Sequence, residues 1–286
     1  MSDQSTQLSV PALYIVATPI GNRDDITLRA LTILRSVDRI LAEDTRHSQH
    51  LLQHYDINRP LVSVHEHNEA GRLTQIVQWL EAGESLALIT DAGTPLISDP
   101  GFVLVRALRE RGLNVVPIPG VSAVITALCA AGLPTDRFQF IGFLPAKAGP
   151  RERTLSAALS YRGTSLCYES PRRLLDTLNL LAELAPERPL VVARELTKQF
   201  ETFLSGTASE LAARVHEDSD QQRGEIVLLI HGQTEDVLNP GIDADALLAL
   251  LAEHMPPKKA AGEAARLLGG SKNDLYARLL AQKSKP

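Results

Sequence analysis

The stretch ALYIVATPIGNRDDITLRALTILRS, residues 12–36, indicates the class of fold. Residues 12–18 form a short apolar run, which is typical of a strand buried on both faces of a sheet. The second half of the stretch has the spacing of one apolar helical face, at Ile26, Leu28, Leu31, Ile33 and Leu34. A buried strand followed by an amphipathic helix is the repeating unit of α/β proteins with a parallel sheet.

The same alternation continues along the chain. Further strands are predicted at 39–43, 60–64, 85–90 and 113–118, and helices near 47–55, 70–82, 99–111 and 121–131. We interpret GFLPAKAGPRER (142–153), rich in Gly, Pro and charge, as a linker. After it, strands are predicted near 163–168, 189–193, 200–204 and 225–231, and helices near 171–184 and 207–216. The prediction is two α/β domains, over 12–141 and 150–232, then a loop at 233–241 and a helical tail over 243–286.

The charge of the chain is distributed unevenly. Its 286 residues hold 29 Lys and Arg against 34 Asp and Glu, a net charge of −5, which taken whole argues against a nucleic-acid partner. Residues 256–286, however, hold seven basic side chains and two acidic ones, on two predicted helices joined by Gly269, Gly270 and Ser271. We therefore predict a basic, helix-turn-helix-like tail that suits phosphate groups.

Other features exclude several classes of protein. The two cysteines, Cys129 and Cys167, form no CxxC motif, so neither a disulfide framework nor a cysteine zinc site is expected. No apolar run reaches the roughly 18–20 residues of a membrane span. Residues 1–11 lack the basic-then-apolar order of a signal peptide. We expect a soluble, cytoplasmic protein.

Three loops follow predicted strands, at 17–25, 90–101 and 117–123. Open α/β sheets bind ligands at such strand ends, and glycines there let a ligand approach the backbone. Each loop taken alone is also consistent with an ordinary turn between a strand and a helix. The GxGxxG, GxxxxGK[ST], GxSxG and HExxH motifs are all missing, which disfavours dinucleotide, P-loop, hydrolase and zinc-protease sites.

Two groups of histidines could form a site. His65 and His67 flank Glu66, which could hold a metal, but a solvated strand end is the simpler interpretation. His47, His50 and His54 share one helical face, and an exposed polar face is the better interpretation of them. No metal site is predicted.

Seven motifs together carry a resemblance. They are ATPIGN (17–22), AEDTRH (42–47), TDAGTPLISDPG (90–101), PGVSA (119–123), GFLP (142–145), YESPRR (168–173) and RELTK (194–198). In this order they resemble the bacterial 16S ribosomal RNA cytidine 2′-O-methyltransferases, the small-subunit methyltransferase I group of the tetrapyrrole-methylase-like superfamily. The resemblance extends from about Leu13 to Leu280. The chain departs from it at Ala17, where glycine is common, and at Arg23, where an apolar residue is frequent.

The resemblance implies a class III methyltransferase fold that holds S-adenosylmethionine between two α/β domains. It places eight residues at the cofactor: Ile20, Asp91, Gly93, Thr94, Pro95, Ile97, Ser122 and Ala123. Asp91 would accept the ammonium or favour the sulfonium of the cofactor, although it could also serve as a turn or helix-cap residue. For catalysis we predict Asp44 as the acceptor of the ribose hydroxyl proton and Arg46 as a ligand of the RNA backbone. A purely structural Asp44–Arg46 ion pair is the alternative.

The resemblance also implies 16S ribosomal RNA, in its decoding region, as substrate, the 30S subunit as partner, and a homodimer. We expect ten basic side chains to contact the RNA: Lys147, Arg151, Arg153, Arg172, Arg173, Arg194, Lys198, Lys258, Lys259 and Lys272. Two other functions stay open, namely methylation of a tetrapyrrole precursor by the same fold, and nucleotide binding without catalysis.

Overall fold

The computed structural model describes residues 11–65, 67–233, 243–268 and 270–283. The chain divides into two compact units, residues 1–232 and 233–286, which are taken in turn. Residues 1–10, which bear on the signal-peptide expectation, and all but the first residue of the predicted loop at 233–241 lie outside the described residues.

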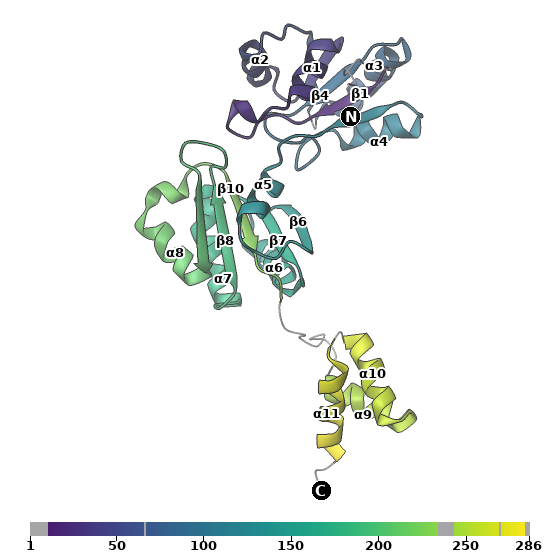
Figure 1. Cartoon of the computed structure of the whole chain (residues 1–286), viewed down its shortest axis with the longest axis vertical. Helices are drawn as coiled ribbons and strands as arrows, with labels where there is room; N and C mark the ends of the chain where they lie inside the picture. Colours follow the sequence, from purple (N-terminus) through teal and green to yellow (C-terminus); the bar gives the residue numbers. More distant parts are fainter. Residues whose placement is uncertain (1–10, 66, 234–242, 269, 284–286) are drawn as a thin grey trace, which may run out of the picture. The chain divides into compact units, whose positions relative to one another are not determined.

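The first sheet has five parallel strands, and Figure 1 shows them in the amino-terminal part of the chain. The strands are β1 (Leu13–Val16), β2 (Arg39–Ala42), β3 (Leu61–Ser63), β4 (Leu86–Ile89) and β5 (Val115–Ile118). Their order is β3-β2-β4-β1-β5, with Leu13 of β1 in register with Leu86 of β4 and Val115 of β5. The predicted strands and their parallel arrangement are confirmed.

Helices cover both faces of this sheet. They are α1 (Leu28–Ser36), α2 (Thr45–His54), α3 (Glu69–Glu81) and α4 (Phe102–Glu110). Leu34 of α1 and Leu52 of α2 pack against one face, while Ile76 of α3 and Leu104 of α4 pack against the other. Because the central strands β1 and β4 are covered on both sides, their side chains are apolar throughout instead of alternating.

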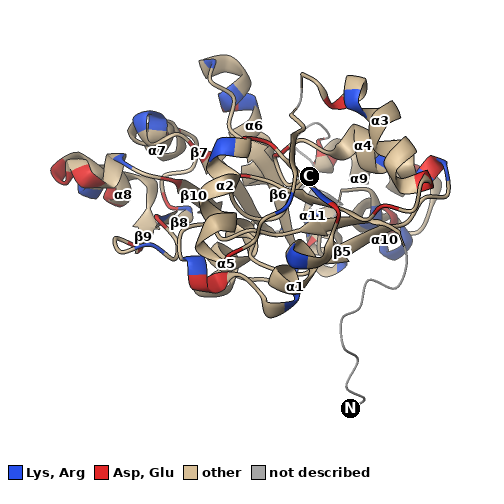
Figure 2. Ribbon diagram, turned by 90° about the horizontal axis from the view of Figure 1, so that it is seen from above, with Lys and Arg blue, Asp and Glu red and all other residues tan. Residues whose placement is uncertain are grey.

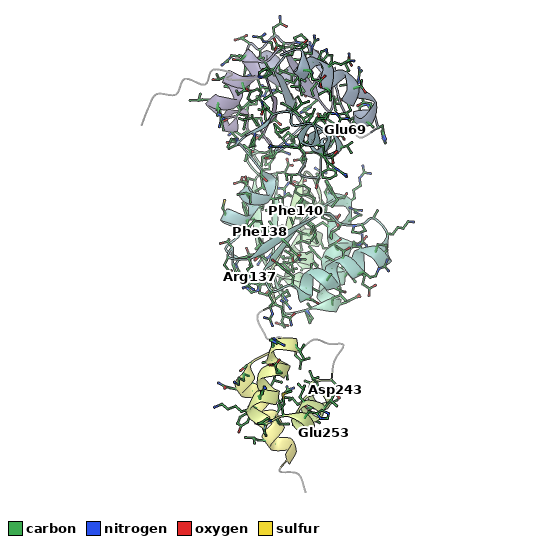
Figure 3. The ribbon with its side chains drawn as sticks, turned by 90° about the vertical axis from the view of Figure 1, so that its right-hand side faces the viewer. Glu69, Arg137, Phe138, Phe140, Asp243 and Glu253 are labelled. Atoms are coloured by element: carbon green, nitrogen blue, oxygen red, sulfur yellow. The ribbon has the colours of Figure 1, made fainter. Side chains whose placement is uncertain are left out.

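The second sheet is mixed, in the order β6-β7-β10-β8-β9. Its strands are β6 (Phe138–Phe143), β7 (Thr164–Glu169), β8 (Pro189–Arg194), β9 (Thr202–Thr207) and β10 (Ile226–Ile230). Only the edge pair β6 and β7 is parallel, and the other three pairs are antiparallel. Helices α6 (Ala148–Ser160), α7 (Leu174–Leu184) and α8 (Ala208–Glu217) pack on one face of this sheet. Phe138 and Phe140 of β6 are labelled in Figure 3.

The linker predicted at 142–153 is wrong. Residues 142–143 end strand β6, and residues 148–153 form the first turns of helix α6. Pro150 favoured the linker interpretation, but it occupies the first turn of the helix, where backbone N–H groups have no partner within the helix. Gly142 has a φ of 72° and lies where the pairing of β6 with β7 shifts between Phe140 and Phe143, a strand irregularity at which glycine is favoured.

Helix α5 (Ala123–Ala130) follows the last strand of the first sheet but packs on the second one. Its Val124, Ala127 and Leu128 contact the face of β7, β8 and β10 that α6 to α8 leave free. The same core includes Ile20, from the loop after β1. The two sheets are thus joined through the loops at the strand ends of the first sheet.

The unit from residue 233 onward is a separate bundle of three helices. They are α9 (Ala244–His254), α10 (Pro257–Leu268) and α11 (Lys272–Lys283). Asp243, labelled in Figure 3, caps α9 by accepting hydrogen bonds from the amides of residues 245 and 246. Leu248, Leu268 and Leu275 meet in its small core. None of the described helices is long and apolar enough to cross a bilayer.

Candidate functional site

A cavity of about 530 Å³ lies at the strand ends of the first sheet. Ile20, Glu43 and Asp91 line it from the loops after β1, β2 and β4, and Ala123 lines it from the start of α5. The second sheet contributes the end of β7 and the start of β10. The loops that the sequence predicted at 17–25, 90–101 and 117–123 therefore converge, as expected for open parallel sheets.

The loop at 90–101 is held in an unusual backbone conformation. Four of its residues have positive φ: Gly93 at 83°, Leu96 at 74°, Ser98 at 68° and Gly101 at 124°. Gly93 also exchanges two backbone hydrogen bonds with Thr18, of 2.8 and 3.0 Å. Non-glycine residues with positive φ are costly, and in folded proteins they gather at functional sites.

A buried carboxylate fixes the far end of this loop. Glu69 of α3, labelled in Figure 3, accepts hydrogen bonds from the amides of Gly101, at 3.3 Å, and Leu104, at 2.6 Å. Both amides belong to the start of α4, where the helix leaves its N–H groups without partners. Glu69 thus ties the loop and the helix after it to α3.

The eight residues predicted at the cofactor divide into two groups. Four line the cavity: Ile20, Asp91, Ile97 and Ala123. The other four, Gly93, Thr94, Pro95 and Ser122, are not among its lining residues and lie within the same loops. Thr94 donates a 2.8 Å hydrogen bond to the carbonyl of Val121, which joins the second loop to the third.

Three of the carboxylates that line the cavity lie close enough to interact electrostatically, on Glu43, Asp91 and Asp99. Thr90 donates a 3.0 Å hydrogen bond to Glu43, and Asp91 accepts one of 3.3 Å from the amide of Asp44. Burial, and then the charge of Glu43, raise the pKa of Asp99 to about 6. The charge of Asp99 therefore changes at a pH close to neutral.

Asp44 and Arg46 are neighbours, but neither lines the cavity. Asp44 caps helix α2 by accepting a 2.8 Å hydrogen bond from the amide of Arg46, and its carboxylate pairs with the guanidinium at 3.1 Å. Hydrogen bonds from Arg46 lower the pKa of Asp44 to about 2. Arg46 is otherwise exposed, with 89% of its side chain accessible. These contacts match the structural alternative, and the catalytic assignment stays a prediction.

Arg173 is held by a buried carboxylate. It pairs with Glu169 at 2.7 Å and donates to the carbonyl of Leu144 at 3.2 Å. The Glu169 side chain is completely buried and also accepts a 2.6 Å hydrogen bond from Thr177. By contrast, Arg172 is exposed and takes part in no ion pair among the described residues.

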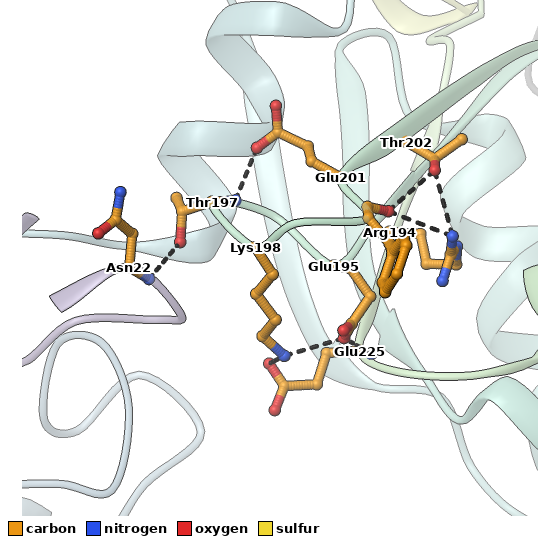
Figure 4. A network of polar contacts seen from close by, with 9 residues as sticks. Asn22, Arg194, Glu195, Thr197, Lys198, Glu201, Thr202 and Glu225 are labelled. Carbon is orange, nitrogen blue, oxygen red and sulfur yellow. Dashed lines mark hydrogen bonds and ion pairs between the residues drawn. The ribbon is translucent and has the colours of Figure 1, made fainter.

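Arg194 and Lys198 form part of the polar network of Figure 4. Arg194 is buried and donates to Gln221, Thr202 and the carbonyl of Phe200, each at 3.2 Å. Lys198 pairs with Glu195 at 2.9 Å and with Glu225 at 3.2 Å. Both cations are therefore engaged within the protein at the second sheet.

The remaining basic residues lie on α6 and on the separate helical unit. Lys147 and Arg153 are exposed, whereas Arg151 is buried and its Nε atom has no hydrogen-bond partner. Lys258 and Lys259 lie on α10 and Lys272 on α11, two helices whose basic residues are coloured blue in Figure 2. Among the predicted cations of the first unit, Arg151 and Arg194 are thus buried instead of lying on the surface.

The chemistry of the cavity fits S-adenosylmethionine. Five carboxylates line it, on Glu43, Asp91, Asp99, Glu169 and Glu225, and none of its described lining residues is Lys, Arg or His. Such walls attract the sulfonium and ammonium groups of the cofactor and repel the polyphosphate of NAD or ATP. Ile97, Leu196, Val227 and other apolar side chains offer a surface for adenine.

Sequence reasoning missed several residues of this cavity. Asp99 lies in TDAGTPLISDPG, and Tyr168 and Glu169 lie in YESPRR, so the motifs signalled them without indicating a role. Glu225 lies in none of the seven motifs, so nothing in the sequence pointed to it. Of the two histidines that flank Glu66, His65 has its Nε2 atom 3.0 Å from the side-chain amide nitrogen of Asn68, and the described residues hold no group suited to a metal. Glu66 lies outside the described residues.

Comparison with known proteins identifies the relatives of the chain. Residues 12–212 match the profile of the tetrapyrrole (corrin/porphyrin) methylases, and residues 239–283 match the RsmI C-terminal HTH domain. The ribosomal RNA small subunit methyltransferase I of Escherichia coli O157:H7 is 49% identical over 98% of this chain and 98% of its own length. The protein of that name from Haemophilus influenzae is 50% identical over 92% of this chain and 94% of its own.

Solved structures show the same fold at low sequence identity. The cobalt precorrin-4 methyltransferase CbiF has a TM-score of 0.55 at 18% identity, covering 77% of this chain and 94% of its own. Uroporphyrin-III C-methyltransferase from Thermus thermophilus, complexed with S-adenyl homocysteine, has a TM-score of 0.53 at 19% identity, covering 77% and 97%. With relatives near 50% identity along nearly its whole length, the chain belongs to the ribosomal RNA small subunit methyltransferase I family, within the tetrapyrrole methylases.

Proposed function

We propose that this protein uses S-adenosylmethionine to methylate the ribose 2′-hydroxyl of a cytidine in the decoding region of 16S ribosomal RNA. The observation that carries the proposal is the acid-lined cavity at the strand ends, in a chain of this family. Bound there, S-adenosylmethionine supplies an electrophilic methyl group. The protein has to hold the hydroxyl in line with that methyl group and accept its proton.

Two carboxylates compete for the role of proton acceptor. The sequence-based proposal is Asp44, with Arg46 on the RNA backbone. The cavity offers Asp99, which lines it and whose pKa of about 6 makes it a stronger base than Asp44, with a pKa of about 2. Asp44→Asn and Asp99→Asn separate the two, since each keeps the size of the side chain. The variant that lacks the acceptor should lose the rise of the single-turnover rate with pH, and the other should keep it.

RNA has to be bound largely outside the acid-lined cavity, because its phosphates are repelled there. We propose that the helical unit docks on RNA through Lys258, Lys259 and Lys272, and that exposed cations of the second sheet's domain, such as Lys147, Arg153 and Arg172, contribute further contacts. Arg151, Arg173, Arg194 and Lys198 stay predictions as RNA ligands, although internal contacts engage the last three.

We further propose that the protein acts as a homodimer on the assembled 30S subunit. Large apolar side chains exposed on the first unit support a subunit interface, among them Phe102 at 65% and Phe138 at 42%. Analytical ultracentrifugation at micromolar concentration tests the dimer, and a monomer at all concentrations would refute it.

The test of the function is incubation with labelled S-adenosylmethionine and three acceptors in parallel: unmethylated 30S subunits, free 16S RNA and a tetrapyrrole precursor. Label on the ribose of a cytidine in the RNA supports the proposal, and nuclease digestion followed by mass spectrometry locates it. Label on the tetrapyrrole, or on a base instead of a ribose, would overturn it. Thermal shifts with S-adenosylmethionine, NAD and ATP also test the alternative of nucleotide binding without catalysis.

A further inference from the structure

A groove of about 320 Å³ opens beside the acid-lined cavity. The two hollows share Ile20, Asp91, Ala92 and Glu225, so they meet along one border. This border includes the loops after β1 and β4, which the family resemblance places at the cofactor. A ligand in the groove would thus lie next to the methyl donor.

The part of the groove that it does not share with the cavity is lined by basic instead of acidic side chains. Beyond the shared border it is lined by Arg23, His47, His50 and Lys198, and it has no carboxylate of its own among its described lining residues. Of the two shared carboxylates, that of Glu225 is paired with Lys198 at 3.2 Å. The boundary between acidic and basic walls therefore runs along the residues that the two hollows share.

Arg23 is held in position by hydrogen bonds, but no carboxylate among the described residues pairs with its guanidinium. It begins the 3₁₀ turn Arg23–Asp25, and its carbonyl accepts a 2.6 Å hydrogen bond from the hydroxyl of Tyr55. Its guanidinium lies 3.3 Å from the ring nitrogen of His54, and the residue is exposed. None of the ion pairs between described residues involves Arg23. An exposed guanidinium that has no carboxylate partner can bind an anion through two parallel hydrogen bonds.

His47 and His50 stand one turn apart on the first half of α2. Both are exposed, both line the groove, and neither takes part in an ion pair among the described residues. An imidazole can donate a hydrogen bond from its N–H group whether it is neutral or protonated. The histidine face that the sequence left as ordinary exposed surface thus becomes one wall of a groove lined by donors.

We propose that this groove binds a phosphate of the RNA strand next to the target ribose, through Arg23, His47 and His50. The inference deepens the proposed function and rests on it. The 2′-hydroxyl and the 3′-phosphate of a nucleotide are carried by adjacent ribose carbons, so a strand that presents the hydroxyl at the border places a phosphate beside it. The carboxylates of the cavity repel that phosphate while the groove attracts it, which fixes the direction of the strand. Lys198 is left out because Glu195 and Glu225 already hold it.

The first experiment measures RNA and cofactor binding of three variants: Arg23→Gln, Arg23→Lys and the double variant His47→Gln with His50→Gln. The matched controls are Arg29→Gln, on the exposed surface of α1, and His216→Gln, on α8, and neither residue lines the cavity or the groove. We expect Arg23→Gln to weaken binding of 30S subunits about tenfold and to reduce the slope of log affinity against log salt by about 0.7. Arg23→Lys should recover part of the loss, and the affinity for S-adenosylmethionine should stay within about twofold of wild type.

The second experiment identifies the phosphate. Single-stranded decoding-region RNAs, each carrying one uncharged methylphosphonate linkage, are titrated with wild type, Arg23→Gln and Arg29→Gln by fluorescence anisotropy. One linkage next to the target cytidine should weaken wild type and Arg29→Gln but leave Arg23→Gln unaffected, because the contact is already lost. If every linkage weakens Arg23→Gln as much as wild type, the groove does not bind a phosphate.

These outcomes are separate from a failure of the proposed function. If the wild type methylates no RNA, the proposed function fails, while the anisotropy comparison still shows whether the groove binds an RNA phosphate. If methylation proceeds and the three variants match Arg29→Gln and His216→Gln in RNA affinity and salt slope, the groove proposal fails alone. Equal loss of 30S and cofactor affinity in Arg23→Gln would mean a distorted loop, and it would also overturn the proposal.

Discussion

The backbone amide of Asn22 donates a 3.0 Å hydrogen bond to the hydroxyl of Thr197, and Figure 4 shows the two side by side. This bond joins the loop after β1 of the first sheet to the turn after β8 of the second. Thr197 has a φ of 65° and Glu195 one of 51°, which are unfavourable values for residues other than glycine. The turn keeps this strained shape because Glu195, Lys198 and Glu201 bond within it, and it presents Thr197 to the loop.

We predict that Gly21→Ala weakens cofactor binding. A Cβ at Gly21 would lie 2.9 Å from the hydroxyl of Thr197 and 3.1 Å from the carbonyl of Leu196, and it would also collide with Lys198. The loop has to move away from the turn, and Ile20 moves with it in the cavity wall. We expect about a tenfold loss of affinity for S-adenosylmethionine by calorimetry, corresponding to about 1.4 kcal/mol.

Gly71→Ala is the matched control for that substitution. A Cβ at Gly71 meets nothing within 4 Å, and the residue lies in helix α3, where Ala is favoured over Gly by up to about 1 kcal/mol. This variant should melt at a slightly higher temperature and bind the cofactor unchanged. Wild-type affinity in Gly21→Ala would show that the loop and the turn are not coupled.

Arg172 and Arg173 should behave differently although they are adjacent. Arg173→Ala leaves the completely buried Glu169 without its cation, and we expect a loss of about 3 kcal/mol in the free energy of unfolding. Arg172→Ala should leave the stability unchanged and weaken RNA binding only. Urea denaturation of both variants, together with filter binding of RNA, measures the two effects, and equal stability of the pair would refute the structural role of Arg173.

Asp99→Asn should stabilise the protein at neutral pH but not in acid. The pKa of Asp99 is raised from 3.8 to about 6, so between these values the folded protein keeps a proton that the unfolded chain has lost. The free energy of unfolding therefore falls as the pH rises through this interval, and the loss is complete above about pH 6. We expect the variant to gain about 1–2 kcal/mol at about pH 7.5, because water in the cavity reduces the full effect, and almost nothing at about pH 4. A gain that is constant across pH would contradict this.

The three lysines of the helical unit should act on RNA through their charge alone. Replacing Lys258, Lys259 and Lys272 by Gln should reduce the slope of log affinity against log salt by about 2, given about 0.7 per lost phosphate contact. Replacing the same three by Arg keeps the charge and should keep the slope. If the Gln and Arg variants bind 30S subunits alike over a range of salt concentrations, the helical unit docks in another way.

Much of the architecture follows from the local pattern. Apolar runs such as residues 12–18 and 85–90 form the parallel strands predicted for them, because strands buried on both faces need apolar side chains throughout. Which strands pair with each other depends on contacts between residues that are distant in the sequence. Neither the order β3-β2-β4-β1-β5 nor the docking of α5 on the second sheet could be predicted from the spacing of apolar residues. The start of α6 was missed because Pro150 is also typical of a loop.

The site was predictable where motifs coincide with strand ends. The loop at 90–101 was identified, and with it Asp91 and Ile97 in the cavity wall. The roles of charged residues were harder to predict, because a charge acts through its partner, and partners are distant in sequence. Arg194 contacts Gln221, and Lys198 contacts Glu225, so neither arginine nor lysine is the free cation that its motif suggested.

The walls of the acid-lined cavity bear on turnover as well as on binding. Transfer of the methyl group turns the cationic sulfonium into a neutral thioether, so the spent ligand carries one positive charge less than the fresh one. Glu169 and Glu225 are paired with Arg173 and Lys198, but Glu43, Asp91 and Asp99 take part in no ion pair among the described residues, and these three hold the two ligands unequally although the ligands are nearly the same in shape. The protein can therefore exchange spent for fresh ligand on the strength of charge, and high salt should raise its sensitivity to product inhibition.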